Sequence, residues 1–234
     1  MDSHDFHFKH PTTIQVSGLT LCGKTRLVRR ILEEQLIQPF ATRIIWVYSE
    51  WQPDYDMIRE QYPSIEFEKG WRDEIFDSLS LEQRNILVLD DQMGVVSSSK
   101  SVADLFNRGS HHRNLTVIYL VQYNNQGKIR VYQGIIDVYN QGKSQRTISL
   151  YSHYSVVFRN GQDASQFRTM AHQICLSDGQ WLGDAFTVAT FKPYGYLVMD
   201  HHPSTPDDQT VSTNILPGEP LTYYIMNNSK FRRY

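Results

Sequence analysis

The chain has 234 residues, a length that suits one α/β domain with a buried sheet better than two domains. Its apolar fraction of 40% and charged fraction of 21% are ordinary for a globular protein and exclude the disordered and fibrous classes. The formal net charge of −2 excludes a generally polyanion-binding surface, so contact with nucleic acid requires a local basic patch or several subunits acting together.

The same bulk features predict the compartment. No apolar run approaches the ~20 residues that span a membrane, so we expect no membrane partner. The segment MDSHDFHFKHPTT lacks the layout of a secretion signal. The only cysteines, Cys22 and Cys175, predict an intracellular, reducing compartment (nucleus or cytoplasm) rather than a disulfide framework. No Cys-x-x-Cys is present and no histidine pair has helical zinc spacing, so structural zinc is not expected.

Strands and helices are predicted to alternate along the chain. Apolar and β-branched runs predict strands at 13–17, 43–50, 65–68, 85–91, 114–122, 153–160 and 194–200. Apolar residues at helical spacing predict helices at 24–38, 54–63, 71–79, 101–113, 163–174 and 182–190. This alternation predicts an α/β fold, a three-layer α/β/α sandwich with a mainly parallel central sheet.

We expect a single domain over residues 11–202, preceded by an extension over 1–10. Residues 203–234 are rich in Pro, Thr, Ser and Asn and are expected to form a loosely packed extension. Ligands of parallel sheets bind at the carboxyl ends of the strands. Gly18, Asp90, Asp91 and Gln122 all end predicted strands, so we expect these four residues to meet at one edge of the sheet.

The stretch GLTLCGKT follows the first of these strands and precedes the first long helix. It matches the phosphate-binding pattern G-x-x-x-x-G-K-[ST] in full. The pattern predicts that backbone N–H groups hold the β-phosphate, that Lys24 reaches the β- and γ-phosphates, and that the Thr25 hydroxyl binds Mg²⁺. The predicted nucleotide-binding residues are Gly18, Leu19, Thr20, Leu21, Cys22, Gly23, Lys24 and Thr25.

The strand ILVLDD supplies two acids at its carboxyl end. Asp90 is expected to hold the Mg²⁺ shell together with Thr25, and Asp91 is expected to orient or deprotonate the attacking water. This resembles a Walker B sequence and favours nucleotide hydrolysis over simple binding. The alternative is a strand end that carries two solvated acids.

Two further residues are candidates for the catalytic machinery. Gln122 ends the strand VIYLVQ and is expected to position water or sense the γ-phosphate, although a polar strand terminus is the alternative. Arg113, or Arg108 before it, could neutralise transition-state charge in the site of a neighbouring subunit, and the alternative is a surface arginine. The guanine-reading motif N-K-x-D is absent, so ATP is the favoured nucleotide.

Several longer stretches carry a family resemblance: GLTLCGKT, RIIWVYSEWQPDYD, ILVLDDQM, VADLFNRGSHHRNLTVIYLVQ, QGKSQRTISLYSHYSVVFRNGQDASQ and KPYGYLVMD. Over residues 10–217 the chain resembles the genome-packaging ATPases of Polinton/Maverick and adintovirus-type elements. These belong to the FtsK–HerA branch of P-loop ATPases, with relatives among the poxvirus-type DNA packaging ATPases.

The resemblance implies a homo-oligomeric ring around double-stranded DNA, with ATP hydrolysis threading the genome into a capsid through a capsid or portal partner, in a virus factory if the element is viral. It implies that the Gln122 strand lies between the strands of residues 13–17 and 86–90. It also implies phosphate and Mg²⁺ roles for Lys24 and Thr25, metal and catalytic roles for Asp90 and Asp91, a sensor role for Gln122, and a trans-acting role for Arg113.

Two features depart from the family pattern. The family loop usually reads GPTGCGKT, whereas this chain has Leu19 and Leu21. Leu21 replaces a glycine that commonly relieves positive-φ strain or allows close phosphate approach. The second departure is an inserted loop, about 123–142, in which YNNQGK recurs as YNQGK. Its lysines and arginines suit either phosphate contacts or a solvated loop.

Two other functions remain open from the sequence. A small-molecule kinase uses the same phosphate loop but needs a lid with clustered arginines, and no such cluster follows Gln122. An inactive or nucleotide-binding relic of an integrated element is the other alternative, favoured by Leu21 and the insertion.

Overall fold

A computed structural model of the chain describes residues 6–92, 102, 105–106, 114–122, 128–132, 135–139, 152–159, 167, 171 and 179–226. The expected arginines Arg108 and Arg113, and most of the expected helices over 101–113 and 163–174, lie outside these residues.

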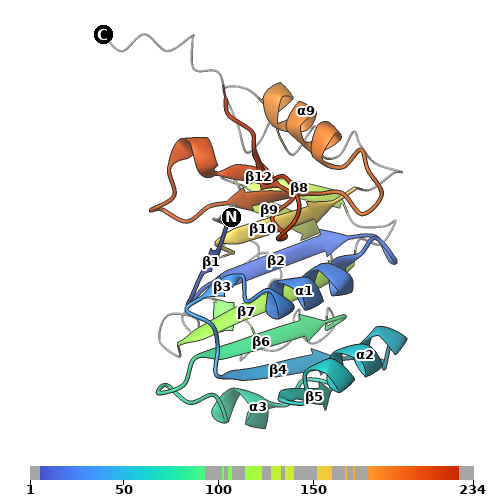
Figure 1. Cartoon of the computed structure of the whole chain (residues 1–234), viewed down its shortest axis with the longest axis vertical. Coiled ribbons are helices and arrows are strands. Elements are labelled where there is room, and N and C mark those ends of the chain that lie inside the picture. Colours follow the sequence, from blue (N-terminus) through green and yellow to red (C-terminus); the bar gives the residue numbers. More distant parts are fainter. Residues whose placement is uncertain are drawn as a thin grey trace.

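Within the described residues, nine strands form one sheet in the order β13-β12-β11-β10-β2-β7-β6-β4-β5 (Figure 1). Their bounds are β2 (Thr13–Gly18), β4 (Arg43–Tyr48), β5 (Ile65–Lys69), β6 (Asn85–Asp90), β7 (Leu115–Gln122), β10 (Tyr154–Phe158), β11 (Tyr196–Asp200), β12 (Val211–Thr213) and β13 (Thr222–Tyr223). Every pair from β5 across to β10 is parallel, and β11, β12 and β13 continue the sheet with antiparallel pairs. The sheet is therefore mainly parallel, as predicted.

Helices cover both faces of this sheet. Alternate residues of β6 enter two different apolar clusters, with Ile86 in one and Leu87 in the other, because successive side chains of a strand point to opposite faces. The Ile86 cluster includes residues of α1 (Lys24–Glu33) and α2 (Pro53–Gln61). The Leu87 cluster includes residues of α3 (Asp73–Asp77) and α9 (Gly179–Ala189). These are the three layers that the alternation of strands and helices predicts.

The position of β7 brings the predicted site residues together. β7 lies between β2 and β6, which is the strand order that the family resemblance implies. Gly18 pairs with Gln122 across β2 and β7, and Asp90 pairs with Leu120 across β6 and β7. The carboxyl ends of three adjacent parallel strands therefore carry the glycine turn, the glutamine and the acids.

The expected extensions at both ends of the domain pack against it. β1 (Phe8–Lys9) pairs with β3 (Ile37–Gln38), and Phe6 and Phe8 are buried in the core beside Tyr154. After residue 203, a short 3₁₀ helix, η2 (Asp207–Gln209), precedes β12 and β13, which join the main sheet. Buried apolar residues such as Phe8 and Ile215 tie both segments to the core, where the sequence predicted extensions outside the domain.

The expected inserted loop contains regular structure. β8 (Lys128–Tyr132) and β9 (Ile135–Tyr139) form an antiparallel pair in which Lys128 lies opposite Tyr139 and Arg130 lies opposite Asp137. The stretch that follows Gln122 is therefore a hairpin over these residues, where the sequence predicted a loop. None of the helices in the described part of the chain has the length and apolar character that a membrane crossing requires.

We predict that Phe8→Ala lowers the free energy of unfolding by about 3–5 kcal/mol, because it leaves a cavity in the core where Phe8 is 0% exposed. His7→Ala, at the exposed neighbouring position, is the matched control and should change stability by less than about 0.5 kcal/mol. Urea denaturation measures the free energy of unfolding of both variants. Equal stability of the two variants would show that this segment is a dispensable extension.

Candidate nucleotide-binding and catalytic site

Residues 19–23 form the loop that connects β2 to α1. A Cβ atom on Gly18 would lie 2.5 Å from Cys22 Sγ and 2.8 Å from Phe158 Cβ, so only glycine fits there. Gly23 has φ 104°, in the left-handed region that glycine adopts without steric cost, and directly precedes α1. The two glycines of the pattern therefore permit close packing at Gly18 and a left-handed backbone at Gly23.

The Lys24 ammonium group lies inside this loop. Its Nζ atom donates to the carbonyl oxygens of Gly18 (3.0 Å) and Leu19 (2.8 Å). Burial lowers the pKa of Lys24, and the nearby charges of Asp90 and Asp91 partly oppose that shift. Neutral carbonyls compensate a buried ammonium only in part, so an anionic oxygen that enters the loop would be a stronger partner.

The amino terminus of α1 offers further donors. The helix has no side-chain cap and no acidic residue in its first turn. Its first N–H groups therefore have no partner within the helix and carry the positive end of the helix dipole. An anion is the natural ligand for such a terminus when it follows a glycine-rich loop.

Asp90 closes β6 and is 5% exposed. Its Oδ2 atom accepts hydrogen bonds from the Tyr55 hydroxyl (2.7 Å) and from Thr25 Oγ1 (3.4 Å). Burial raises the pKa of the Asp90 carboxyl group, while the Tyr55 hydrogen bond and the charge of Lys24 partly oppose the shift. The acid, the hydroxyl and the ammonium that the sequence singled out thus share one site.

These oxygens fit the magnesium ion that the loop implies. Thr25 Oγ1 and Asp90 Oδ2 lie within hydrogen-bonding distance, so one small cation could contact both. Mg²⁺ prefers hard oxygen ligands and binds through one or two carboxylates plus phosphate oxygens and water. No cluster of three or more His, Cys, Asp or Glu residues that could hold a metal occurs in the described residues, and a Mg²⁺–nucleotide site needs none.

The segment after β4 holds both acids in place. Tyr55 of α2 is 0% exposed, and burial followed by the charge of Asp90 raises the pKa of its hydroxyl, so it remains a donor at neutral pH. Ser49 Oγ donates to the backbone carbonyl of Asp91, and Gln92 Nε2 donates to Ser49 Oγ at 2.9 Å. Asp91 has φ 54° and an exposed side chain, so its carboxyl group is free to face a bound ligand.

Sequence reasoning missed Tyr55, Ser49 and Gln92. Ser49 lies at the carboxyl end of the predicted strand 43–50, and that position alone could have placed it at the ligand edge of the sheet. Tyr55 gave no such signal, because a tyrosine on the apolar face of a helix is most simply a core residue.

Gln122 and Thr20 meet between β7 and the loop. Gln122 Nε2 donates to Thr20 Oγ1, which ties the predicted sensor directly to the phosphate loop. Leu19 packs partly buried against the Leu87 cluster, and Cys22 packs against the Ile86 cluster. Burial raises the pKa of the Cys22 thiol, which suits a packing residue rather than a nucleophile. Arg113 lies outside the described residues, so its role stays a prediction.

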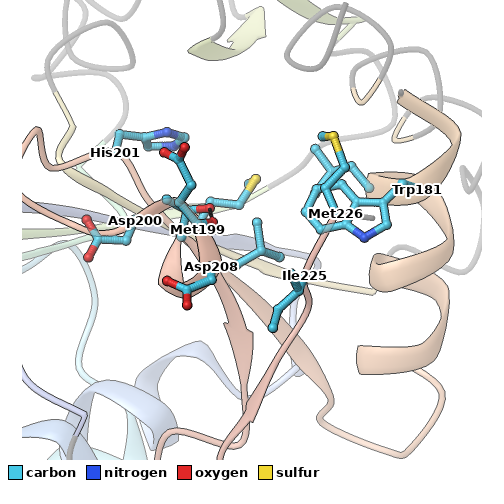
Figure 2. A pocket seen from close by; sticks show the side chains of 11 residues that line it. Trp181, Met199, Asp200, His201, Asp208, Ile225 and Met226 are labelled. Carbon is cyan, nitrogen blue, oxygen red and sulfur yellow. Dashed lines mark hydrogen bonds between the residues drawn. The ribbon is translucent and has the colours of Figure 1, made fainter. Parts of the chain in front are cut away.

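A second cavity, of about 410 Å³, lies at the opposite edge of the sheet (Figure 2). Asp200 pairs with Tyr154, and Tyr154 pairs with Ile14, so Asp200 lies level with the amino end of β2, whereas Gly18 lies at its carboxyl end. Its labelled side chains are mainly apolar or acidic: Trp181, Met199, Asp200, His201, Asp208, Ile225 and Met226. Carboxylates repel a triphosphate, so phosphate chemistry belongs at the Lys24 edge.

No protein-family model and no curated protein sequence matches the chain. Its fold is similar to that of the genome packaging NTPase B204 from Sulfolobus turreted icosahedral virus 2. The structure with sulfate has a TM-score of 0.52 and 15% identity over 83% of this chain and 94% of B204. The structure with ATP-gammaS has a TM-score of 0.51 and 14% identity, over 83% and 95%.

B204, the DNA-packaging ATPase of Sulfolobus turreted icosahedral virus, is also similar, with a TM-score of 0.51 and 12% identity over 93% of this chain and 98% of that protein. The chain has a P-loop NTPase fold. At these identities the likeness establishes the fold, and the geometry of Lys24, Thr25 and Asp90 locates the phosphate loop within it.

We predict that Leu21→Gly raises the free energy of unfolding by about 1 kcal/mol. Leu21 has φ 62° and is 91% exposed, so its side chain bears the steric cost of the left-handed region and gains little from packing. Leu21→Ala is the control, because it removes the side chain but keeps a Cβ. Chemical denaturation measures both variants. If Leu21→Ala gained as much stability as Leu21→Gly, the left-handed conformation of Leu21 would carry no steric cost.

We predict that Asp90→Asn raises the Tm of the ligand-free protein at neutral pH. Burial raises the pKa of Asp90 above its value in the unfolded chain, so the ionised carboxylate destabilises the fold. This cost disappears as the pH falls through the raised pKa, so the two proteins should converge in acid.

Thermal denaturation between neutral and acidic pH tests this prediction, with Asp91→Asn at the exposed neighbouring position as the control. An Asp90→Asn protein that is less stable than wild type at neutral pH would show that the buried carboxylate is a net stabilising group.

Proposed function

We propose that the chain is an ATP-hydrolysing motor that acts as a homo-oligomer on double-stranded DNA and packages a viral or transposon genome. The observation that carries the catalytic part is the convergence of Lys24, Thr25, Asp90 and Gln122 at the carboxyl ends of β2, β6 and β7. Nucleotide hydrolysis uses the groups that lie around this loop: an ammonium, a hydroxyl, a buried carboxylate and an amide.

The roles of the residues follow from their positions. The loop amides and Lys24 would bind and orient the phosphates, with the ammonium exchanging its two carbonyl partners for phosphate oxygens. Thr25 and Asp90 would hold Mg²⁺, which when bound neutralises charge on the β- and γ-phosphates. Asp91 would accept the proton of the attacking water, and Gln122 would orient that water or report on the γ-phosphate.

The packaging part of the proposal rests on two supports. The similar folds belong to genome-packaging NTPases, and one of these binds ATP-gammaS. The sequence stretches around GSHHRNLTVIYLVQ and RTISLYSHY resemble packaging ATPases of Polinton/Maverick and adintovirus-type elements. We therefore propose an oligomeric ring with a capsid or portal partner, working in a reducing intracellular compartment, with Arg113 acting on the site of a neighbouring subunit.

The net charge of −2 constrains how DNA would bind. With this charge, DNA binding would need either a local basic patch or phosphate contacts summed over several copies. Lys128 and Arg130 are basic residues of β8, the next strand along the chain after β7, which ends at Gln122.

We predict that ATP hydrolysis is stimulated by double-stranded DNA and that Lys24→Ala abolishes it, because the variant lacks the cation that binds the β- and γ-phosphates. Asp91→Asn should keep ATP binding and lose hydrolysis by a factor of about 10² or more, because it lacks the base. Hydrolysis and ATP binding, each with and without DNA, measure these effects beside the solution mass.

A Lys24→Ala protein that hydrolyses ATP at the wild-type rate would remove the phosphate-loop assignment. ATP turnover that DNA does not stimulate, but that requires a small-molecule phosphate acceptor, would instead favour the kinase alternative. A folded oligomer with no turnover would favour the inactive relic.

A further inference from the structure

A cleft adjoins the phosphate loop on the side of β10 and β11. Two neighbouring cavities, of about 260 and 290 Å³, share Phe158 at the end of β10 and the turn Lys192–Gly195 before β11. One is also lined by Leu21 and Cys22 of the loop, and the other by Gly23 and Arg26 at the start of α1. The cleft therefore opens directly onto the phosphate loop.

Large apolar side chains are exposed in this cleft. Leu21 is 91% exposed, Phe191 is 80% exposed and Tyr194 is 59% exposed, and all three line the 290 Å³ cavity. Single exposed apolar residues are ordinary on a protein surface, but three around one cavity indicate a surface that something covers.

Tyr194 has a strained backbone conformation and lies beside the phosphate loop. It has φ 61°, a left-handed conformation that costs free energy in a tyrosine. A Cβ atom on Gly23 would lie 3.1 Å from Tyr194 Cδ1, so the ring packs beside the last glycine of the loop. The Arg26 guanidinium carbon lies 5.8 Å from the ring centroid, which brings a cation to the aromatic face.

The turn that carries Tyr194 is fixed on both sides. The Gly195 N–H donates to Lys192 O at 3.0 Å, and a Cβ on Gly195 would lie 2.6 Å from Ala189 O, so the turn packs tightly against the end of α9. Lys192 Nζ donates to Asn214 Oδ1 at 3.1 Å. A pre-formed turn presents its ring without a large cost in conformational entropy on binding.

The direction of a bound triphosphate follows from the sheet order. Asp90 and Gln122, which face the metal and the γ-phosphate, lie on β6 and β7, on one side of β2. β10 and β11 lie on the other side, about 10 Å across the sheet. A nucleotide whose γ-phosphate faces Asp90 therefore has its nucleoside end facing the cleft.

We propose that this cleft binds the nucleoside half of the nucleotide, with the base stacked on the Tyr194 ring and Arg26 beside the ribose and α-phosphate. This inference rests on the proposed function, since it assigns the other half of the same ligand. A flat π-system stacks on an aromatic face for ~1–3 kcal/mol per base, whereas an inorganic triphosphate has no such group. The Tyr194 ring should therefore strengthen the binding of a nucleotide but not the binding of an inorganic triphosphate.

The test compares ATP with inorganic tripolyphosphate by titration calorimetry on the full chain, in wild type, Tyr194→Ala and Tyr194→Phe. We expect Tyr194→Ala to weaken ATP binding about ten-fold or more and to leave tripolyphosphate binding unchanged. Tyr194→Phe, which keeps the ring, should bind both ligands as wild type does. Leu81→Ala, at an exposed apolar residue that lines neither cavity, is the neutral control.

Unchanged ATP binding by Tyr194→Ala would overturn the proposal, and a change in solution mass in that case would assign the cleft to a subunit contact. Equal loss of ATP and tripolyphosphate would overturn it as well, because the ring would then act only by supporting Gly23. A wild-type protein that binds neither ligand would refute the proposed function, and with it the assignment of the cleft.

Discussion

The buried carboxylate of Asp90 is the constraint on which the rest of the site depends. A charge with 5% exposure is tolerated only with good partners, and Asp90 has the Tyr55 hydroxyl, the Thr25 hydroxyl and the nearby Lys24 ammonium. These partners come from α2 and from the first turn of α1, so one acid fixes two helices relative to β6. The raised pKa of Asp90 shows that these partners do not fully offset its burial, which leaves it prepared for a metal cation.

Three residues at the same edge of the sheet have strained backbone conformations. Leu21, Asp91 and Tyr194 all have positive φ, and they lie in the phosphate loop, beside the metal acid and in the adjoining cleft. Non-glycine residues hold such conformations at a cost of ~1–3 kcal/mol each, and they persist where the surroundings over-determine them. The fold thus gives up stability around the proposed nucleotide site to hold the loop, the acid and the ring in fixed positions, and a bound ligand would return part of that cost.

Much of this site could be predicted from the sequence because its signals are local. The continuous apolar runs that end in Gly18, Asp90 and Gln122 predicted buried parallel strands, and the topology of such sheets brings their carboxyl ends together. Contacts between distant segments left no comparable signal. Tyr55 looks like a core residue, Phe8 stands in a polar stretch, and the turn at Tyr194 is recognisable only once β11 lies beside β10. The pairing of β8 with β9 was missed because the near-repeat that flanks these strands was interpreted as an inserted loop.

If Lys24 and Asp90 serve one nucleotide–metal site, Mg²⁺ should change the affinity for ATP through Asp90. Calorimetric titration of ATP into wild type and Asp90→Asn, with and without Mg²⁺, separates the phosphate contacts from the metal contact. The account predicts that Mg²⁺ strengthens ATP binding in wild type, and that Asp90→Asn retains the metal-free affinity but loses this enhancement. An Asp90→Asn protein with the full Mg²⁺ enhancement would contradict it.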